Sequence, residues 1–94
     1  MPFHPDIIVT GKDSPEVLLA IEARTNENEG THLVSSMKNY LLRMSCPFGL
    51  LVFPKRIWMY RNTFSGGTDE AVREIGRFPF ALPRWNDNNL ASPI

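Results

Sequence analysis

One stretch of the chain decides its fold: residues 33–61 read LVSSMKNYLLRMSCPFGLLVFPKRIWMYR. From Leu33 to Met44 the apolar residues recur with the three- and four-residue spacing that is typical of an amphipathic helix. Pro47 ends this pattern, because proline cannot continue the helical hydrogen-bond ladder. The stretch therefore predicts one helix, followed by structure of a different kind.

Two strands are predicted after this helix. Residues 48–53 are almost wholly apolar, and residues 57–61 are rich in aromatic and β-branched side chains. The turn-forming sequence Pro54-Lys55-Arg56 separates them. Because its apolar run is nearly unbroken, we expect the first strand to be buried on both faces of a sheet.

A hairpin is predicted before the helix. Two apolar runs, residues 7–9 and 17–21, flank a cluster of turn formers at 11–15. The helix that follows is long enough for a crossover between parallel strands. We therefore expect a mixed sheet.

The end of the chain predicts a second helix and an extension. Thr68 is a suitable N-cap for a helix, with Asp69 and Glu70 in its first turn, and Gly76 is a suitable C-terminal stop. The expected fold is α/β, or mixed α+β, with about four strands flanked by helices. We expect residues 1–76 to form its core, in the order strand, strand, helix, strand, strand, helix. Residues 77–94, which contain three prolines, are expected to be an extension packed on that core.

Composition excludes several classes of protein. The chain has 94 residues, of which 43% are hydrophobic and 21% charged, as in ordinary globular domains. No apolar run approaches the roughly 20 residues of a membrane helix, and the first residues lack the pattern of a signal peptide. A single cysteine, Cys46, excludes an internal disulfide and favours a cytoplasmic location.

Charge is unevenly distributed although the formal net charge is zero. Residues 1–30 hold six acidic and two basic residues, whereas residues 31–64 hold five basic residues and no acidic one. A basic surface beside an acidic site would suit a polyanion. A solvated helix face with a basic turn explains the same pattern, and both interpretations stay open.

Three charged residues of the hairpin are the candidates for chemistry. If the chain turns near residue 14, Asp6 lies opposite Glu22, with the two Cβ atoms within roughly 5 Å. Two carboxylates that close repel each other unless a cation lies between them, and Mg²⁺ prefers such oxygen ligands. Arg24 projects from the same face as Glu22. An ordinary cross-strand ion pair of these three residues is the alternative.

The same residues carry a family resemblance. Residues 4–8 (HPDII) and 19–25 (LAIEART) resemble the motif of the PD-(D/E)XK nuclease superfamily, which has the restriction-endonuclease-like fold. Residues 36–41 look like the helix that follows in such domains, and residues 48–54 and 57–61 look like the later strands. The resemblance covers about residues 3–75. Arg24 stands where the motif has lysine, and the usual first helix and first strand are lacking before Asp6.

The resemblance implies a function and a set of ligands. It implies that Asp6, Glu22 and the backbone carbonyl of Ala23 bind Mg²⁺ or Mn²⁺, and that Arg24 positions water and phosphate. The implied activity is metal-dependent phosphodiester hydrolysis, usually of DNA, impaired because arginine cannot act as a base. The alternative is a non-catalytic member of the same fold that binds nucleic acid or serves in assembly.

Four basic residues are candidates for DNA contacts: Lys38, Arg43, Arg56 and Arg61. Trp58 and Tyr60 share one face of a predicted strand and could stack on bases, but we favour core packing under the second predicted helix as their role. The first strand of the hairpin has no predicted neighbour on its outer side. We therefore expect a homodimer, or a partner chain that covers this edge, and no membrane association.

Overall fold

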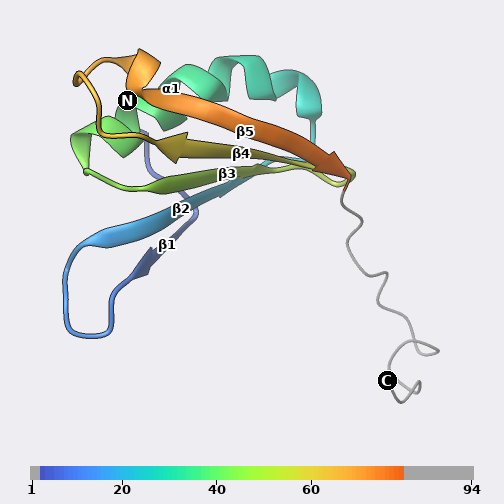
Figure 1. Ribbon diagram of the computed structural model, residues 1–94. Helices are drawn as coiled ribbons and strands as arrows, with labels where there is room; N and C mark the ends of the chain where they lie inside the picture. The colour runs from blue at the N-terminus through green and yellow to red at the C-terminus, as the bar shows by residue number, and fades with distance from the viewer. Residues whose placement is uncertain (1–2, 80–94) are drawn as a thin grey trace, which may run out of the picture.

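The computed structural model describes residues 3–79, which form one five-stranded mixed sheet and one α-helix (Figure 1). The strands follow one another across the sheet in chain order: β1 (Ile7–Thr10), β2 (Val17–Ala23), β3 (Phe48–Val52), β4 (Arg56–Asn62) and β5 (Val72–Pro79). Strands β2 and β3 are parallel, and every other neighbouring pair is antiparallel. The expected mixed α+β architecture is therefore confirmed, but the sheet has five strands where about four were expected.

Helix α1 (Gly30–Arg43) forms the crossover between the parallel strands β2 and β3. A short 3₁₀ turn, η1 (Glu27–Glu29), leads into it. The predicted apolar stripe is the buried side of the helix, where Leu33, Met37 and Leu41 join the core. The helix ends before Ser45, which adopts a positive φ of 50° and turns the chain toward β3.

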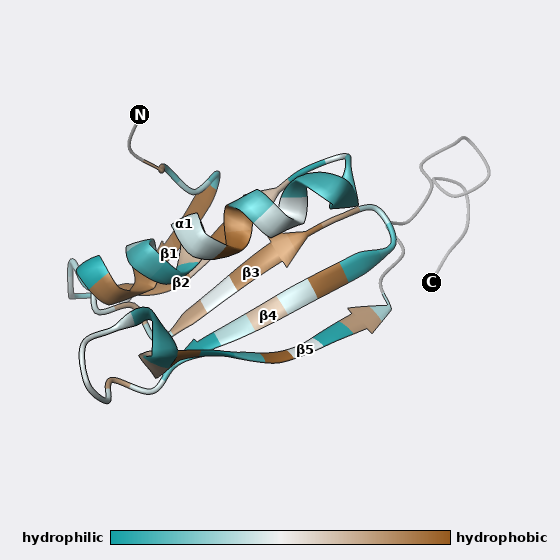
Figure 2. Cartoon of the chain, turned by 90° about the horizontal axis from the view of Figure 1, so that it is seen from above, coloured by the Kyte–Doolittle hydropathy of each residue, from teal (hydrophilic) through white to brown (hydrophobic). Residues whose placement is uncertain are grey.

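The core lies between α1 and one face of the sheet. On that face the buried side chains alternate along each strand: Ala20 and Glu22 on β2, Leu51 on β3, and Trp58 and Tyr60 on β4. Figure 2 shows α1 lying over the strands. Trp58 and Tyr60 are 4% and 1% exposed, so they pack in the core and present no face on which bases could stack.

The face of the sheet opposite α1 is partly exposed, which contradicts the prediction that β3 is buried on both faces. Strand β3 was expected to be buried on both faces, yet its exposure alternates, and Phe48 is 41% exposed. Within residues 3–79, the only α-helix lies on the other side of the sheet. An apolar run specifies a strand well, but it does not specify how many layers will cover that strand.

The prediction of a second helix after Thr68 is wrong. Residues 69–71 form only a 3₁₀ turn, η2 (Asp69–Ala71), and the chain then continues as β5 alongside β4. Thr68 makes no side-chain cap hydrogen bond. The backbone of β4 offers a full ladder of hydrogen-bonding groups to this segment, and tertiary pairing of that kind overrides weak helical signals.

The predicted extension falls mostly outside the described residues. Residues 77–79 belong to β5, and residues 80–94 lie beyond the part of the chain that the structure describes. No helix within residues 3–79 is both long enough and apolar enough to cross a membrane.

Candidate functional site

The hairpin register places Asp6 opposite Glu22, as the sequence predicts. Ile7 pairs with Ile21 and Ile8 with Ala20, so the next pair outward is Asp6 with Glu22. Two hydrogen bonds between backbone N–H groups and carboxylate oxygens hold this end of the hairpin. The Asp6 N–H donates to Glu22 Oε1 over 3.0 Å, and the Ala23 N–H donates to Asp6 Oδ2 over 2.9 Å.

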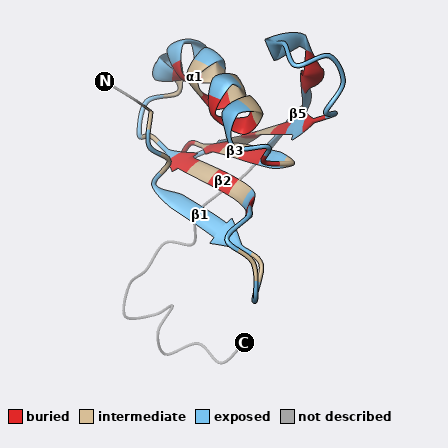
Figure 3. Ribbon diagram, turned by 90° about the vertical axis from the view of Figure 1, so that its left-hand side faces the viewer, coloured by how far each residue is buried: buried red, intermediate tan, exposed pale blue. Residues whose placement is uncertain are grey.

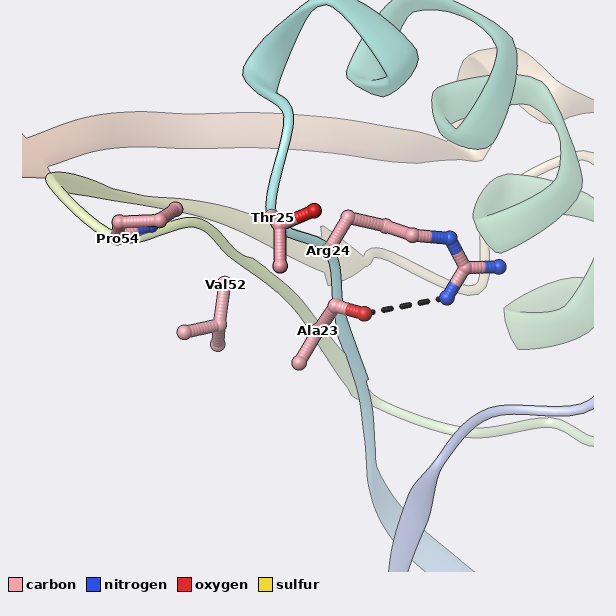
Figure 4. Close-up of a pocket in the computed structure, with 5 residues that line it drawn as sticks. All are labelled: Ala23, Arg24, Thr25, Val52 and Pro54. Atoms are coloured by element: carbon pink, nitrogen blue, oxygen red, sulfur yellow. Dashed lines mark hydrogen bonds between the residues drawn. The ribbon is translucent and has the colours of Figure 1, made fainter.

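Arg24 contacts the carboxylates of both residues of this pair. Its Nη1 forms an ion pair with Glu22 Oε2, donates to the Ala23 carbonyl over 3.1 Å, and lies 3.9 Å from Asp6 Oδ2. Figure 4 shows the side chain curling back toward that carbonyl and pointing away from Val52 and Pro54. The Arg24 Nε also lies 3.7 Å from Glu29 Oε2. One guanidinium therefore contacts all three oxygen groups that the resemblance assigns to a metal.

Glu22 is the unusual member of the group because its carboxylate is buried. Its side chain is 2% exposed, whereas the side chains of Asp6 and Arg24 are 50% and 37% exposed. Burial raises the pKa of Glu22 above its ordinary value, because loss of water penalises the charged form, and the Asp6 charge raises it further. The Arg24 charge and the hydrogen bond from the Asp6 N–H act in the opposite direction.

The site lies at an open end of the sheet rather than in a closed cavity. A shallow hollow of about 200 Å³ adjoins it, lined by Ala23, Arg24, Thr25, Val52 and Pro54. Within residues 3–79 no three histidine, cysteine, aspartate or glutamate side chains come together as a metal site. The candidate donor set has two carboxylates and one carbonyl, so any further ligands of an ion would be water molecules.

The four basic candidates lie at different places in the fold. Arg56, at the start of β4, is 3.5 Å from Glu27 in the turn that follows Arg24, and is therefore near the site. Lys38 and Arg43 belong to α1, and the Arg43 guanidinium lies 5.6 Å from the centre of the Tyr40 ring. Arg61 projects from the sheet face opposite to α1, because its neighbours on β4 point into the core.

The sequence reasoning missed Glu29 as a neighbour of the site. It lies five residues beyond Arg24, and the η1 turn brings it back against the guanidinium. The acid-rich sequence of residues 27–29 before the helix was the available signal.

Comparisons with known proteins found no matching family model, no matching curated protein and no matching solved structure. The nuclease resemblance therefore stays a prediction that rests on the residues described above.

Proposed function

We propose that the protein is a metal-dependent phosphodiesterase domain of the PD-(D/E)XK type that acts on DNA. Asp6, Glu22 and the carbonyl of Ala23 would hold Mg²⁺ or Mn²⁺, and Arg24 would hold the phosphate. The observation that carries the proposal is the convergence of these three oxygen groups on one positively charged nitrogen, Arg24 Nη1.

The donor set suits a hard divalent cation. Carboxylate and carbonyl oxygens are the ligands that Mg²⁺ prefers, and Mg²⁺ commonly keeps several water ligands. Asp6 is half exposed, which leaves one side of the donor set open to water and substrate. Glu22 is buried and has a raised pKa, so a neighbouring cation stabilises its charged form. When bound, such an ion activates water and neutralises charge on a phosphate.

Arg24 has a second position within reach in this proposal. Its side chain is 37% exposed and its Nε lies 3.7 Å from Glu29, and the proposal requires it to rotate outward, away from Glu22, when the metal binds. A guanidinium binds phosphate oxygens in a bidentate manner but stays protonated, so it cannot act as a base. We therefore expect weak hydrolysis, with Arg24 in a phosphate-binding role.

The shape of the site favours a polymeric substrate. The hollow of about 200 Å³ beside the site is lined by neither Asp6 nor Glu22, and Asp6 is half exposed, so a substrate would reach the donor set from an open surface. A DNA strand lying across the surface needs no enclosure. Of the four basic candidates, Arg56 contacts Glu27 in the turn that follows Arg24 and is our proposed backbone contact, with Lys38, Arg43 and Arg61 as weaker candidates.

A second candidate function is favoured by the contacts of Arg24 itself. Because its guanidinium already neutralises Glu22 and bonds to the Ala23 carbonyl, it supplies the positive charge that the oxygen groups need. The domain would then be a non-catalytic module that binds nucleic acid or serves in assembly, with Arg24 as a structural ion-pair partner.

Manganese binding separates the two functions. We expect Mn²⁺ at ten times its dissociation constant to raise the midpoint of thermal unfolding by about 5 °C or more. Asp6→Asn and Glu22→Gln should abolish this shift, because each removes one ligand charge. The matched control is Glu29→Gln, which removes an acid that contacts Arg24 but lies outside the donor set.

Plasmid nicking with Mn²⁺ then tests the reaction. We expect weak nicking by the native protein, none by Asp6→Asn, and faster nicking by Arg24→Lys. Equal Mn²⁺ binding by the native protein and Asp6→Asn would refute the metal site. Salt-dependent DNA binding without any metal effect would establish the second candidate instead.

A further inference from the structure

Strand β1 is an edge strand with an exposed backbone and exposed apolar side chains. Ile7, Ile8 and Val9 are 55%, 49% and 41% exposed, and Figure 3 shows the strand as exposed along its length. Even Ile8, which pairs with the fully buried Ala20, is not covered. An edge of this kind is a template for pairing with another strand.

The other edge of the sheet is protected. Strand β5 carries Arg73 and Arg77, ends at Pro79, and contains an irregularity at Ile75, where the register with β4 shifts. Charges, proline and bulges are the features with which proteins block edge pairing. Strand β1 contains no charged residue and no proline. The register shift between β1 and β2 places its extra residue on β2, so β1 itself has no bulge. Strand β1 is therefore the edge at which a strand can be added.

The directions of the backbone groups follow from the hydrogen bonds of β2. Ala23 directs its N–H toward β1, and Arg24 directs its N–H to Val52, the last residue of β3. Because these directions alternate along a strand, the backbone N–H and C=O groups of Ile21 and Leu19 also point toward β1. The backbone groups of their partners, Ile7 and Val9, point toward β2. The N–H and C=O groups of the alternate residues, Ile8 and Thr10, therefore point outward from the sheet.

We propose that β1 pairs antiparallel with β1 of a second copy, around a two-fold axis at Val9. An antiparallel pair with two-fold symmetry places one residue opposite itself. With Val9 on the axis, Ile8 lies opposite Thr10 of the second copy, and the converse also holds. The outward groups then close four backbone hydrogen bonds. The same register places Asp6 opposite Lys12 of the second copy at each end of the pair.

Charge complementarity selects this register and this partner. Lys12 is exposed and takes part in none of the ion pairs found within residues 3–79. An axis at Ile8 would place Asp6 opposite Thr10 and would need the Asp6 N–H, which already donates to Glu22. A second copy of this strand supplies both opposite-charge pairs at once, and this complementarity argues for a second copy as the partner. Each copy then contributes an ammonium group beside the carboxylates of the other.

Disulfide trapping tests the register. In the proposed dimer the two copies of residue 9 form a non-hydrogen-bonded pair with Cα atoms about 4.5 Å apart, which a disulfide can span. Val9→Cys should therefore form a covalent dimer under mild oxidation. The two copies of residue 8 would be diagonal neighbours about 7–8 Å apart, so Ile8→Cys should form much less covalent dimer. Ile75→Cys, on the protected edge, is the matched control. The native Cys46 is fully buried in all variants.

Sedimentation of the unmodified chain tests the dimer independently. We expect reversible dimerisation, and Lys12→Glu should raise the dimer dissociation constant about 10-fold, because two attractive pairs become repulsive. Lys55→Glu, at an exposed turn, should leave it unchanged. A monomer at 500 µM, or faster trapping of Ile8→Cys than of Val9→Cys, would overturn the proposal. These measurements need no metal, so their outcome is independent of the proposed function.

Discussion

Replacing Arg24 with alanine should show how much the candidate site depends on its cation. In the native chain the buried Glu22 carboxylate has two charged or polar partners: the Arg24 guanidinium at Oε2 and the Asp6 N–H at Oε1. The substitution removes the first and leaves a carboxylate, 2% exposed in the native chain, beside the negative charge of Asp6. An uncompensated buried charge is costly.

The burial of the two partners sets the expected magnitude. Removing one partner of a fully buried ion pair costs about 3–5 kcal/mol, and an exposed pair contributes about 0–1 kcal/mol. Glu22 is buried but Arg24 is 37% exposed, so water already screens one side of the pair. We expect Arg24→Ala to lower the free energy of unfolding by about 2 kcal/mol at pH 7, between these limits.

The pH dependence identifies the cause of this loss. Burial raises the pKa of Glu22 above its ordinary value of 4.5, so the native state holds this proton to higher pH than the unfolded state does. The stability linked to that proton is fully present below pH 4.5 and is lost as the pH rises through the raised pKa. Because Arg24 lowers this pKa, Arg24→Ala raises it further. The destabilisation should therefore be large at pH 7 and small near pH 4.

Urea denaturation at the two pH values measures both effects. The control is Arg56→Ala, which breaks the exposed Arg56–Glu27 pair and should cost less than 1 kcal/mol. Glu22→Gln combined with Arg24→Ala should be more stable at pH 7 than Arg24→Ala alone, because no charge is left buried. The reasoning is refuted if Arg24→Ala costs no more than Arg56→Ala, or if its cost is the same at both pH values.

Two further substitutions test the packing of α1 on the sheet. Gly30→Ala should lower the free energy of unfolding by about 1–3 kcal/mol, because the added Cβ would overlap the Trp58 ring and lie 3.0 Å from Phe53; thermal unfolding measures it. No destabilisation would show that this ring has room to move. Asn62→Ala should cost about 1–3 kcal/mol, because Asn62 is 3% exposed and its Nδ2 donates to the Leu41 carbonyl over 3.1 Å. Urea denaturation should show this cost, and a loss below 0.5 kcal/mol would contradict it.

Local patterns determined much of this protein. The stripe from Leu33 to Met44 specified α1, because apolar side chains at that spacing form one face of a helix and need a surface to cover. The turn formers between residues 11 and 15 fixed the first hairpin and hence its register. That register is why the pairing of Asp6 with Glu22 could be predicted.

Tertiary structure decided what local patterns could not. Helical signals from Thr68 to Gly76 predicted a second helix, and pairing with the free edge of β4 made residues 72–79 into β5 instead. Whether the apolar run of β3 would be covered on one face or two depended on the number of layers, which no local pattern encodes. Glu22 is buried because it lies on the core-facing side of β2, and Arg24 packs against it beside Glu29 of the η1 turn. Burial is a property of the whole packed chain, and it is burial that gives this ion pair its energetic weight.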